Sequence, residues 1–378
     1  MNRREFCRRF AAAGGTVALA PLIDACSPFA TSTRANTVPS TKAFSDHIKE
    51  KSTVTPGTEY VSTLASDAAS GAMIMDDSLV TKIALVRTRD RSEGVREAVR
   101  LLGFGGIRGD RVLLKPNFNS ADESPGSTHV DTLSTLIGEL NELGAGSITV
   151  GDRSGMGHTR AVMQQKGLDQ LASDLGFDLV AFDELEDEEW TVIRSNDFHW
   201  KDGFAVPRML LDAETVVQTC NLKTHQYGGH FTMALKNSVG LAAKKVGNIG
   251  NDYMSELHGS PYQRLMIAEI NSAYKPDLIV MDGIEAFVTG GPADGRKVSP
   301  EVILAGTDPV AIDAIGVAIL RLFGTTPEVS KGSVFDQEQI ARAVELGLGV
   351  TSPDQIQLVT TGEGSEEFSS QITSMLNS

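Results

Sequence analysis

Short apolar runs alternate with helix-like segments along most of the chain beyond residue 80. Seven runs have the length and composition of strands, at residues 82–86, 111–114, 147–150, 178–182, 277–280, 302–305 and 355–360. Segments with apolar residues at helical spacing lie between them, at residues 92–102, 130–143, 161–175, 310–322 and 335–346. This alternation predicts an α/β fold for residues 80–378, with a mostly parallel sheet flanked by helices.

The alternation breaks between residues 183 and 211. The acidic run DELEDEE is followed there by two predicted strands with no helix between them. We therefore expect a small antiparallel insertion around 183–211, with the acidic run on its solvated surface.

The first 26 residues have the pattern of an export signal. Arg3 and Arg4 are followed by Phe6 and by a short Gly/Ala-rich apolar stretch, an arrangement that resembles the twin-arginine signal. The sequence Leu-Ile-Asp-Ala-Cys, ending at Cys26, is similar to a lipobox, although its aspartate departs from the usual pattern. Lipidation of Cys26 and ordinary cleavage nearby both remain open. We expect an exported protein, in the periplasm or at the extracytoplasmic membrane surface, with residues 27–79 as a flexible Ser/Thr/Ala-rich tether.

Charge and cysteine content restrict the partners. The formal net charge of −15 argues against nucleic acid as a partner, so a small anionic ligand would need a local basic pocket. Lys223, Lys236, Lys244 and Lys245 could supply such a pocket. The three cysteines form no C-x-x-C motif, which makes an iron–sulfur cluster unexpected, and Cys220 is interpreted as a small buried apolar residue.

One segment concentrates side chains that core packing does not need. Residues 221–240 read NLKTHQYGGHFTMALKNSVG, and the apolar run LLDAETVVQTCNL, which predicts a buried strand, leads into them. Open α/β sheets bind their ligands beyond the carboxyl ends of strands. We therefore place a site here, with Lys223, His225, Lys236 and Asn237 as candidate residues.

Other predicted strands also end in polar side chains. These are Lys115 and Asn117, Asp152 and Arg153, Asp282, and Asp308. In a parallel sheet all these residues would lie on one rim. Structural explanations also exist, because Asp152 could cap a turn, Asp282-Gly283 could form a tight turn, and Asp308-Pro309 is a good start for a helix.

The residue types suggest two kinds of chemistry. A desolvated lysine or a histidine can transfer protons near neutral pH, so we regard Lys223, His225, Lys236 and Asp152 as candidate catalytic residues. Ligand binding is expected from Lys115, Asn117, Asn237, Asp282 and Asp308. Alternatively, His225, His230 and His258 could hold a divalent metal ion, although their spacing matches no recognised metal motif. His47 and His199 are expected on the surface.

The motifs taken together resemble a known family. LLKPN at 113–117, VGDRSG at 150–155, the segment 221–240, ELH at 256–258, VMDGIEA with GGPADG, and GTDPVAIDA at 306–314 are similar to the domain of unknown function 362 in order and spacing. The resemblance covers residues 112–318. It implies that one site contains Lys115, Asp152, Lys223, His225, Lys236, Asn237, His258, Asp282 and Asp308. Many members carry an iron–sulfur segment, whose cysteines this chain lacks.

Three functions agree with these observations. The first is an exported enzyme that acts on a small anionic or polar substrate through lysine and histidine acid–base chemistry, with or without a metal ion. The second is a lipoprotein that binds a ligand or cofactor without chemistry. The third is a redox partner that borrows its cofactor.

Overall fold

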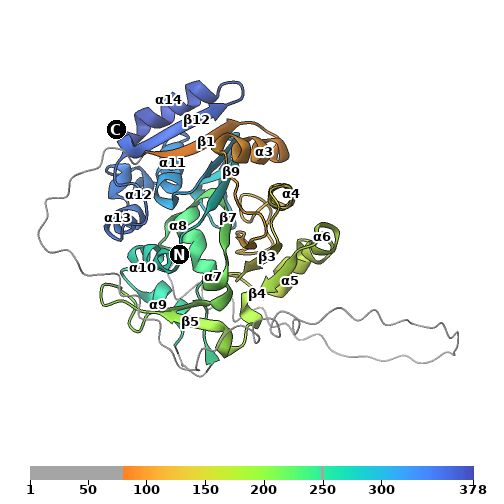
Figure 1. Cartoon of the computed structure of the whole chain (residues 1–378). Coiled ribbons are helices and arrows are strands. Elements are labelled where there is room, and N and C mark those ends of the chain that lie inside the picture. Colours follow the sequence, from red (N-terminus) through yellow and green to blue (C-terminus); the bar gives the residue numbers. More distant parts are fainter. Residues whose placement is uncertain (1–79, 248–250) are drawn as a thin grey trace, which may run out of the picture. The chain divides into compact units, whose positions relative to one another are not determined.

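The computed structural model describes residues 80–247 and 251–378 (Figure 1). The predicted signal at 1–26, the anchor at Cys26, the tether at 27–79 and His47 lie outside these residues. None of the helices described is long and apolar enough to cross a membrane.

Ten of the described strands form one large sheet. Eight of them follow the order β12-β1-β11-β9-β7-β2-β3-β4, while β8 and β10 extend β7 and β9 as hairpins. Their bounds are β1 Thr81–Arg87, β2 Arg111–Lys115, β3 Ser147–Asp152, β4 Asp178–Ala181, β7 Thr215–His225, β8 His230–Thr232, β9 Leu278–Gly290, β10 Gly295–Val298, β11 Val302–Gly306 and β12 Ile356–Thr361.

Most neighbours in this sheet run parallel, as the alternating sequence predicts. The strands β9, β7, β2, β3 and β4 form one continuous parallel block, and β1 pairs in parallel with β12. Strand β11 is antiparallel to both of its neighbours, β1 and β9. The carboxyl end of β11 therefore lies at the opposite edge of the sheet from those of β2, β3 and β7.

Helices cover both faces of the sheet (Figure 1). One apolar core unites the sheet with α3 Arg91–Leu102, α4 Val130–Glu142, α5 Thr159–Gln165 and α6 Leu168–Leu175. A second core, on the other face, includes α8 Ala234–Asn237, α10 Gln263–Ile270, α11 Pro309–Leu322, α12 Pro327–Ser330, α13 Glu338–Glu345 and α14 Ser365–Leu376. This arrangement confirms the predicted fold class.

The predicted antiparallel insertion is also present. Strands β5 Trp190–Ile193 and β6 Phe204–Pro207 form a separate two-stranded antiparallel sheet. A third apolar core joins it to α7 Arg208–Asp212, α9 Tyr253–Gly259 and one side of α10. His199 in this insertion contacts Glu269 through Nδ1, at 2.6 Å, so it is partly buried and not a simple surface residue.

Three elements differ from the sequence-based expectation. The helix expected at 161–175 is divided into α5 and α6, because Gly167 adopts a φ of 71°, a left-handed conformation that interrupts a helix. Strand β9 is 13 residues long, far longer than its predicted run at 277–280, and β7, Thr215–His225, begins and ends later than the apolar run at 210–222 that predicted it. Both strands continue through polar residues, because they lie in the middle of the sheet with neighbours on both sides.

Candidate site at the carboxyl ends of β2, β3 and β7

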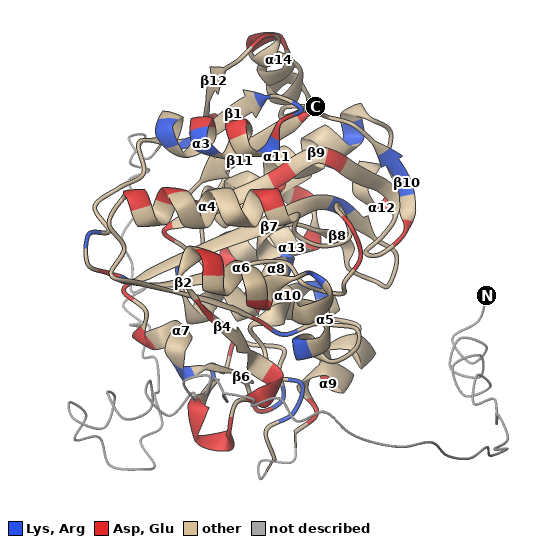
Figure 2. Ribbon diagram, turned by 90° about the vertical axis from the view of Figure 1, so that its right-hand side faces the viewer, with Lys and Arg blue, Asp and Glu red and all other residues tan. Residues whose placement is uncertain are grey.

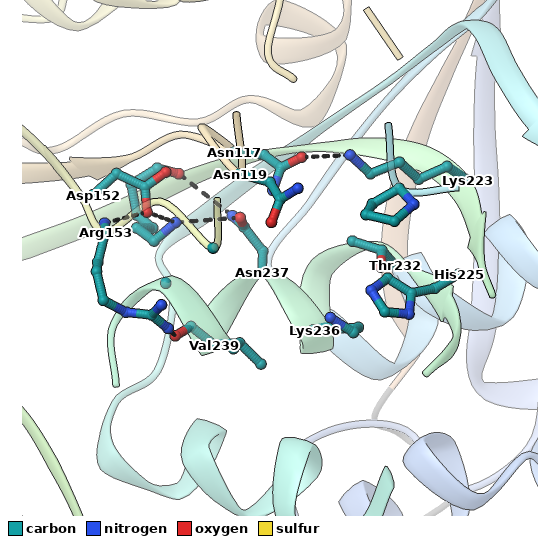
Figure 3. A pocket seen from close by; sticks show the side chains of 14 residues that line it. Asn117, Asn119, Asp152, Arg153, Lys223, His225, Thr232, Lys236, Asn237 and Val239 are labelled. Atoms are coloured by element: carbon teal, nitrogen blue, oxygen red, sulfur yellow. Dashed lines mark hydrogen bonds and ion pairs between the residues drawn. The ribbon is translucent and has the colours of Figure 1, made fainter. Parts of the chain in front are cut away.

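A polar cavity of about 50 Å³ lies at the carboxyl ends of three adjacent parallel strands (Figure 3). Three strand ends, the β7–β8 hairpin and α8 surround it. Its lining consists of Lys115, Asn117, Asn119, Asp152, Arg153, Gly155, Lys223, His225, Thr232, Lys236, Asn237, Val239, Gly240 and Pro292. A buried water occupies about 10–15 Å³ of such volume. The cavity therefore has room for several waters, or for the charged end of a small ligand.

An ion pair between Lys115 and Asp152 forms one wall. Their side chains are almost completely buried, and Lys115 Nζ lies 2.7 Å from Asp152 Oδ1. Lys115 Nζ also donates to Pro116 O at 2.5 Å and to Asn237 Oδ1 at 3.3 Å, so all three ammonium hydrogens have protein acceptors. Lys115 therefore has no hydrogen left for a ligand.

Asp152 is equally occupied by the protein. Besides Lys115, its carboxylate accepts from the backbone N–H groups of Phe118 at 2.6 Å and Arg153 at 2.7 Å. Burial lowers the pKa of Lys115 and raises that of Asp152, while their mutual attraction and hydrogen bonds oppose both shifts. The pair acts as a fixed support that joins β2 to β3.

Arg153 is held by the segment that follows α8. Its guanidinium donates to Ala242 O at 2.7 Å and to Val239 O. Desolvation is the main influence on this buried group and lowers its pKa. Arg153 adds positive charge next to the cavity without using a carboxylate partner.

Lys223 differs from Lys115 in the number of its acceptors. The side chain is completely buried, and its Nζ donates to Asn117 Oδ1 at 2.8 Å and to Gly126 O at 2.5 Å. Burial, followed by the charge of Lys236, lowers the pKa of Lys223 to about 7. A neutral amine has two N–H bonds and one lone pair, so two acceptors satisfy its hydrogens and leave the lone pair without a partner.

Lys236 and His225 lie together at the turn of the β7–β8 hairpin (Figure 3). A Cβ added to Gly229 would lie 2.7 Å from Lys236 Cε and 3.0 Å from His225 Nδ1, which places both side chains against this glycine. In the described part of the chain, Lys236 Nζ has no hydrogen-bond acceptor. Burial and then Arg153 lower the pKa of Lys236 to about 8, and burial lowers that of His225 well below its usual value.

Three polar atoms of the cavity wall have no partner among the described residues. They are His225 Nδ1, Thr232 Oγ1 and Asn119 Nδ2, all shielded from solvent. His225 and Thr232 are only 8% and 5% exposed. Unpaired buried polar atoms are costly, so their concentration around one cavity indicates a place prepared for a polar ligand.

A buried carboxyl group behind the cavity holds α8 in place. Asp313 Oδ1 on α11 accepts from the backbone N–H of Ala234 at 2.7 Å, and its carboxylate also accepts from Leu235. Burial raises the pKa of Asp313 to about 8. Through these contacts Asp313 orients the short helix that carries Lys236 and Asn237.

Seven of the predicted site residues therefore meet in the cavity, namely Lys115, Asn117, Asp152, Lys223, His225, Lys236 and Asn237. Asn117 and Asn237 fix the two lysines, since Asn117 accepts from Lys223 and Asn237 accepts from Lys115. The sequence suggested that Lys223 and His225 follow the strand, but both residues belong to β7 itself.

Asp282 and Asp308 lie elsewhere, which corrects the expectation of one shared rim. Asp282 is inside β9, pairs with Arg91 at 2.9 Å and accepts from Thr132 at 2.8 Å. Asp308 follows the antiparallel strand β11, so it lies at the opposite sheet edge. There it caps α11 through the N–H groups of Val310 and Ala311, the structural role that Asp308-Pro309 indicated.

The three histidines of the metal hypothesis do not converge. His230, at a positive φ of 60°, and His258, on α9, are absent from the cavity lining. Within residues 80–247 and 251–378, no group of three or more His, Cys, Asp or Glu side chains is placed to hold a metal ion. Cys220 is the cysteine within these residues. It is buried and forms no disulfide, as expected for a small apolar core residue.

Sequence reasoning missed Asn119, Thr232 and Gly240. Asn119 follows Asn117 by two residues, and Thr232 lies inside the polar segment 221–240, so their positions gave a signal. Gly240 lies against the ion pair, because an added Cβ would be 2.4 Å from Asp152 Oδ1 and 2.7 Å from Lys115 Nζ.

The cationic groups of the cavity contrast with the acidic helices α4 and α6. Figure 2 shows that α4 and α6 carry carboxylates and no lysine or arginine on the side facing the viewer. The cavity instead combines Lys115, Arg153, Lys223 and Lys236 with Asp152 alone among the carboxylates. These features define an α/β protein with a buried, lysine-rich cavity at the carboxyl ends of its parallel strands.

The chain belongs to the family described as domain of unknown function (DUF362), whose model matches residues 112–318. It is 26% identical to a thylakoid-associated protein of Synechocystis sp. over 257 residues, which cover 65% of this chain and 76% of that protein. Among solved structures, it is similar to the lactate racemase apoprotein from Thermoanaerobacterium thermosaccharolyticum, with a TM-score of 0.38 and 17% identity. That match covers 59% of this chain and just over half, 54%, of the solved chain.

Proposed function

We propose that the protein is an enzyme that binds a small anionic substrate in this cavity and acts on it through Lys223 and His225. The observation that supports this most is the hydrogen bonding of Lys223. Its two acceptors match the two N–H bonds of a neutral amine, and the side chain lines the cavity. A buried neutral lysine is a base or nucleophile at neutral pH.

The substrate's negative charge has a clear partner. Lys236 lines the cavity and has unused N–H donors, whereas those of Lys115 are all engaged. With a pKa of about 8, Lys236 is mostly charged at neutral pH and can pair with a carboxylate or phosphate. Lys236 therefore holds the anion, and the Lys115–Asp152 pair positions Asn237 and the strand ends.

Proton transfer is shared between Lys223 and His225. They are two residues apart on β7, so their side chains leave the same face of the strand. The low pKa of His225 keeps its imidazole neutral, and its Nδ1 has no protein partner. One group can accept a proton from the substrate while the other returns one.

The test combines binding with proton exchange. Melting temperatures are measured with phosphate, acetate, glycolate, pyruvate and glyoxylate, and the substrates that bind are incubated in D₂O and followed by proton NMR. We expect binding that is lost in Lys236→Met, and loss of a carbon-bound proton signal that requires Lys223.

Lys223→Met is compared with Lys82→Met, which alters an exposed lysine on β1. Binding and exchange that persist unchanged in both Lys223→Met and Lys236→Met would refute the proposal. Binding without exchange in the wild type would favour a non-catalytic binding protein instead.

A further inference from the structure

The cavity also indicates what kind of substrate it accepts. We propose that Lys223 Nζ attacks the carbonyl carbon of a small oxo-acid and forms an imine with it. This inference rests on the proposed function, because it names the substrate class and the covalent step of the same cavity.

The arrangement of Lys223 favours a nucleophile over a purely electrostatic role. Both neutral N–H bonds point at fixed acceptors, Asn117 Oδ1 and Gly126 O, so the orientation of the lone pair is fixed as well. Asn117 is itself held, since its backbone N–H donates to Thr128 Oγ1 at 2.8 Å. Desolvation next to a second cationic group is a recognised way to activate a lysine for attack on a carbonyl, and Lys236 is that group here.

The unpaired polar atoms fit the carbonyl oxygen. Thr232 is directly opposite Lys223 in the β7–β8 pairing, so the two side chains lie on the same face of the hairpin. Thr232 Oγ1 and Asn119 Nδ2 can each donate a hydrogen bond, and neither has a protein acceptor. A carbonyl oxygen between them would meet this need, while the carboxylate of the same molecule would pair with Lys236.

The atoms of the step balance without a further reactant. The nitrogen lone pair forms a bond to the carbonyl carbon, and the carbon–oxygen double bond becomes the single bond of a carbinolamine. The oxygen then leaves as water with the two hydrogens of the amine, and a carbon–nitrogen double bond remains. Thr232 and His225 lie beside the lysine to pass the proton to the departing oxygen.

The size of the cavity limits the oxo-acid. A volume of about 50 Å³ has room for the carboxylate and carbonyl groups of an oxo-acid, which make up most of a two- or three-carbon acid. Glyoxylate and pyruvate are therefore the probes to use, with glycolate as the analogue of matched size that lacks the carbonyl.

The test traps the imine by reduction. The protein is incubated with glyoxylate or pyruvate and sodium cyanoborohydride near pH 7, and the adduct is located by peptide mass spectrometry. At this pH the neutral fraction of Lys223 exceeds that of an exposed lysine by about a thousandfold, so labelling concentrates on Lys223. Lys223→Met removes the adduct, and Lys82→Met keeps it.

Thr232→Val provides a second variant that retains the amine. We expect its trapping rate to fall about tenfold, since the hydroxyl that receives the carbonyl oxygen is missing, while glycolate still raises its melting temperature. Labelling spread evenly over exposed lysines, or no adduct on Lys223, overturns the imine.

If glycolate and glyoxylate bind but nothing is trapped, only the covalent step fails. If none of the anions, phosphate and acetate included, binds, the proposed function fails with it.

Discussion

Replacement of Lys223 by methionine tests, through stability alone, whether the pKa of this buried lysine is lowered. Burial lowers its pKa from 10.5 to about 7. Between these values the unfolded chain carries a proton on Lys223 that the folded protein lacks. The free energy of unfolding of the wild type therefore rises with pH in this window, by about 1.4 kcal/mol per pH unit from this group.

The variant has no such group, so the difference between the two proteins depends on pH. Relative to Lys223→Met, the wild type gains about 3 kcal/mol of stability between about pH 7.5 and about pH 9.5. Loss of the hydrogen bonds to Asn117 and Gly126 changes the variant by a similar amount at every pH in this range, so it does not affect the slope. Groups that do not interact with Lys223 are common to both proteins and cancel in the difference, whereas Lys236 is coupled to Lys223 and contributes to the slope.

The assay is urea denaturation of both proteins at three pH values across this window, with Lys82→Met as the control. We expect Lys82→Met to follow the wild type in parallel at every pH. A difference between wild type and Lys223→Met that stays constant over this range would show that Lys223 is an ordinary charged lysine, and the argument for a neutral amine would fail.

Three further predictions concern the supports of the cavity, and each is measured by chemical denaturation. Lys115→Met leaves the buried Asp152 unpaired and costs about 3–5 kcal/mol, much of which returns in Lys115→Met/Asp152→Asn. Gly240→Ala pushes against the ion pair and costs about 1–3 kcal/mol, whereas Gly138→Ala, with open space on α4, stabilises by up to about 1 kcal/mol. Asp313→Ala orphans the N–H of Ala234, costs about 1–3 kcal/mol and weakens anion binding, while Asp313→Asn keeps the acceptor. Because the folded pKa of Asp313 is raised to about 8, its carboxyl favours folding at low pH, and the wild type loses stability relative to Asp313→Asn as the pH rises from about 4 to about 8.

The sequence predicted the sheet because its signal is local. Alternating apolar runs and helical spacing reflect which faces are buried, and this information is present in each short segment. The direction of a strand is a different matter. Nothing in VILAG distinguishes a parallel from an antiparallel β11, and for this reason Asp308 was expected at the wrong edge.

The site was predicted in part for the same physical reason. The grouping of Lys115, Asp152 and Lys223 was predictable because the carboxyl ends of neighbouring parallel strands lie at one edge of the sheet. Their different roles depend on hydrogen-bond partners that are distant in sequence. Lys223 and its acceptor Gly126 are separated by 97 residues, and Asn237 reaches Lys115 across 122. No local pattern records which lysine has three acceptors and which has two.

This difference in acceptors also explains how one small cavity can hold several lysines. Three charged amines in one buried space would repel each other strongly. Lys115 is neutralised by Asp152, and Lys223 reduces the conflict because its pKa of about 7 leaves much of it neutral at neutral pH, as its two acceptors permit. Lys236 then keeps the uncompensated charge of the three. A bound anion would neutralise Lys236 and raise the pKa of Lys223, because the charge of Lys236 is one of the causes that lower it. The affinity for an anion and the basicity of Lys223 are therefore coupled, so that anion binding should shift the stability slope described above towards higher pH.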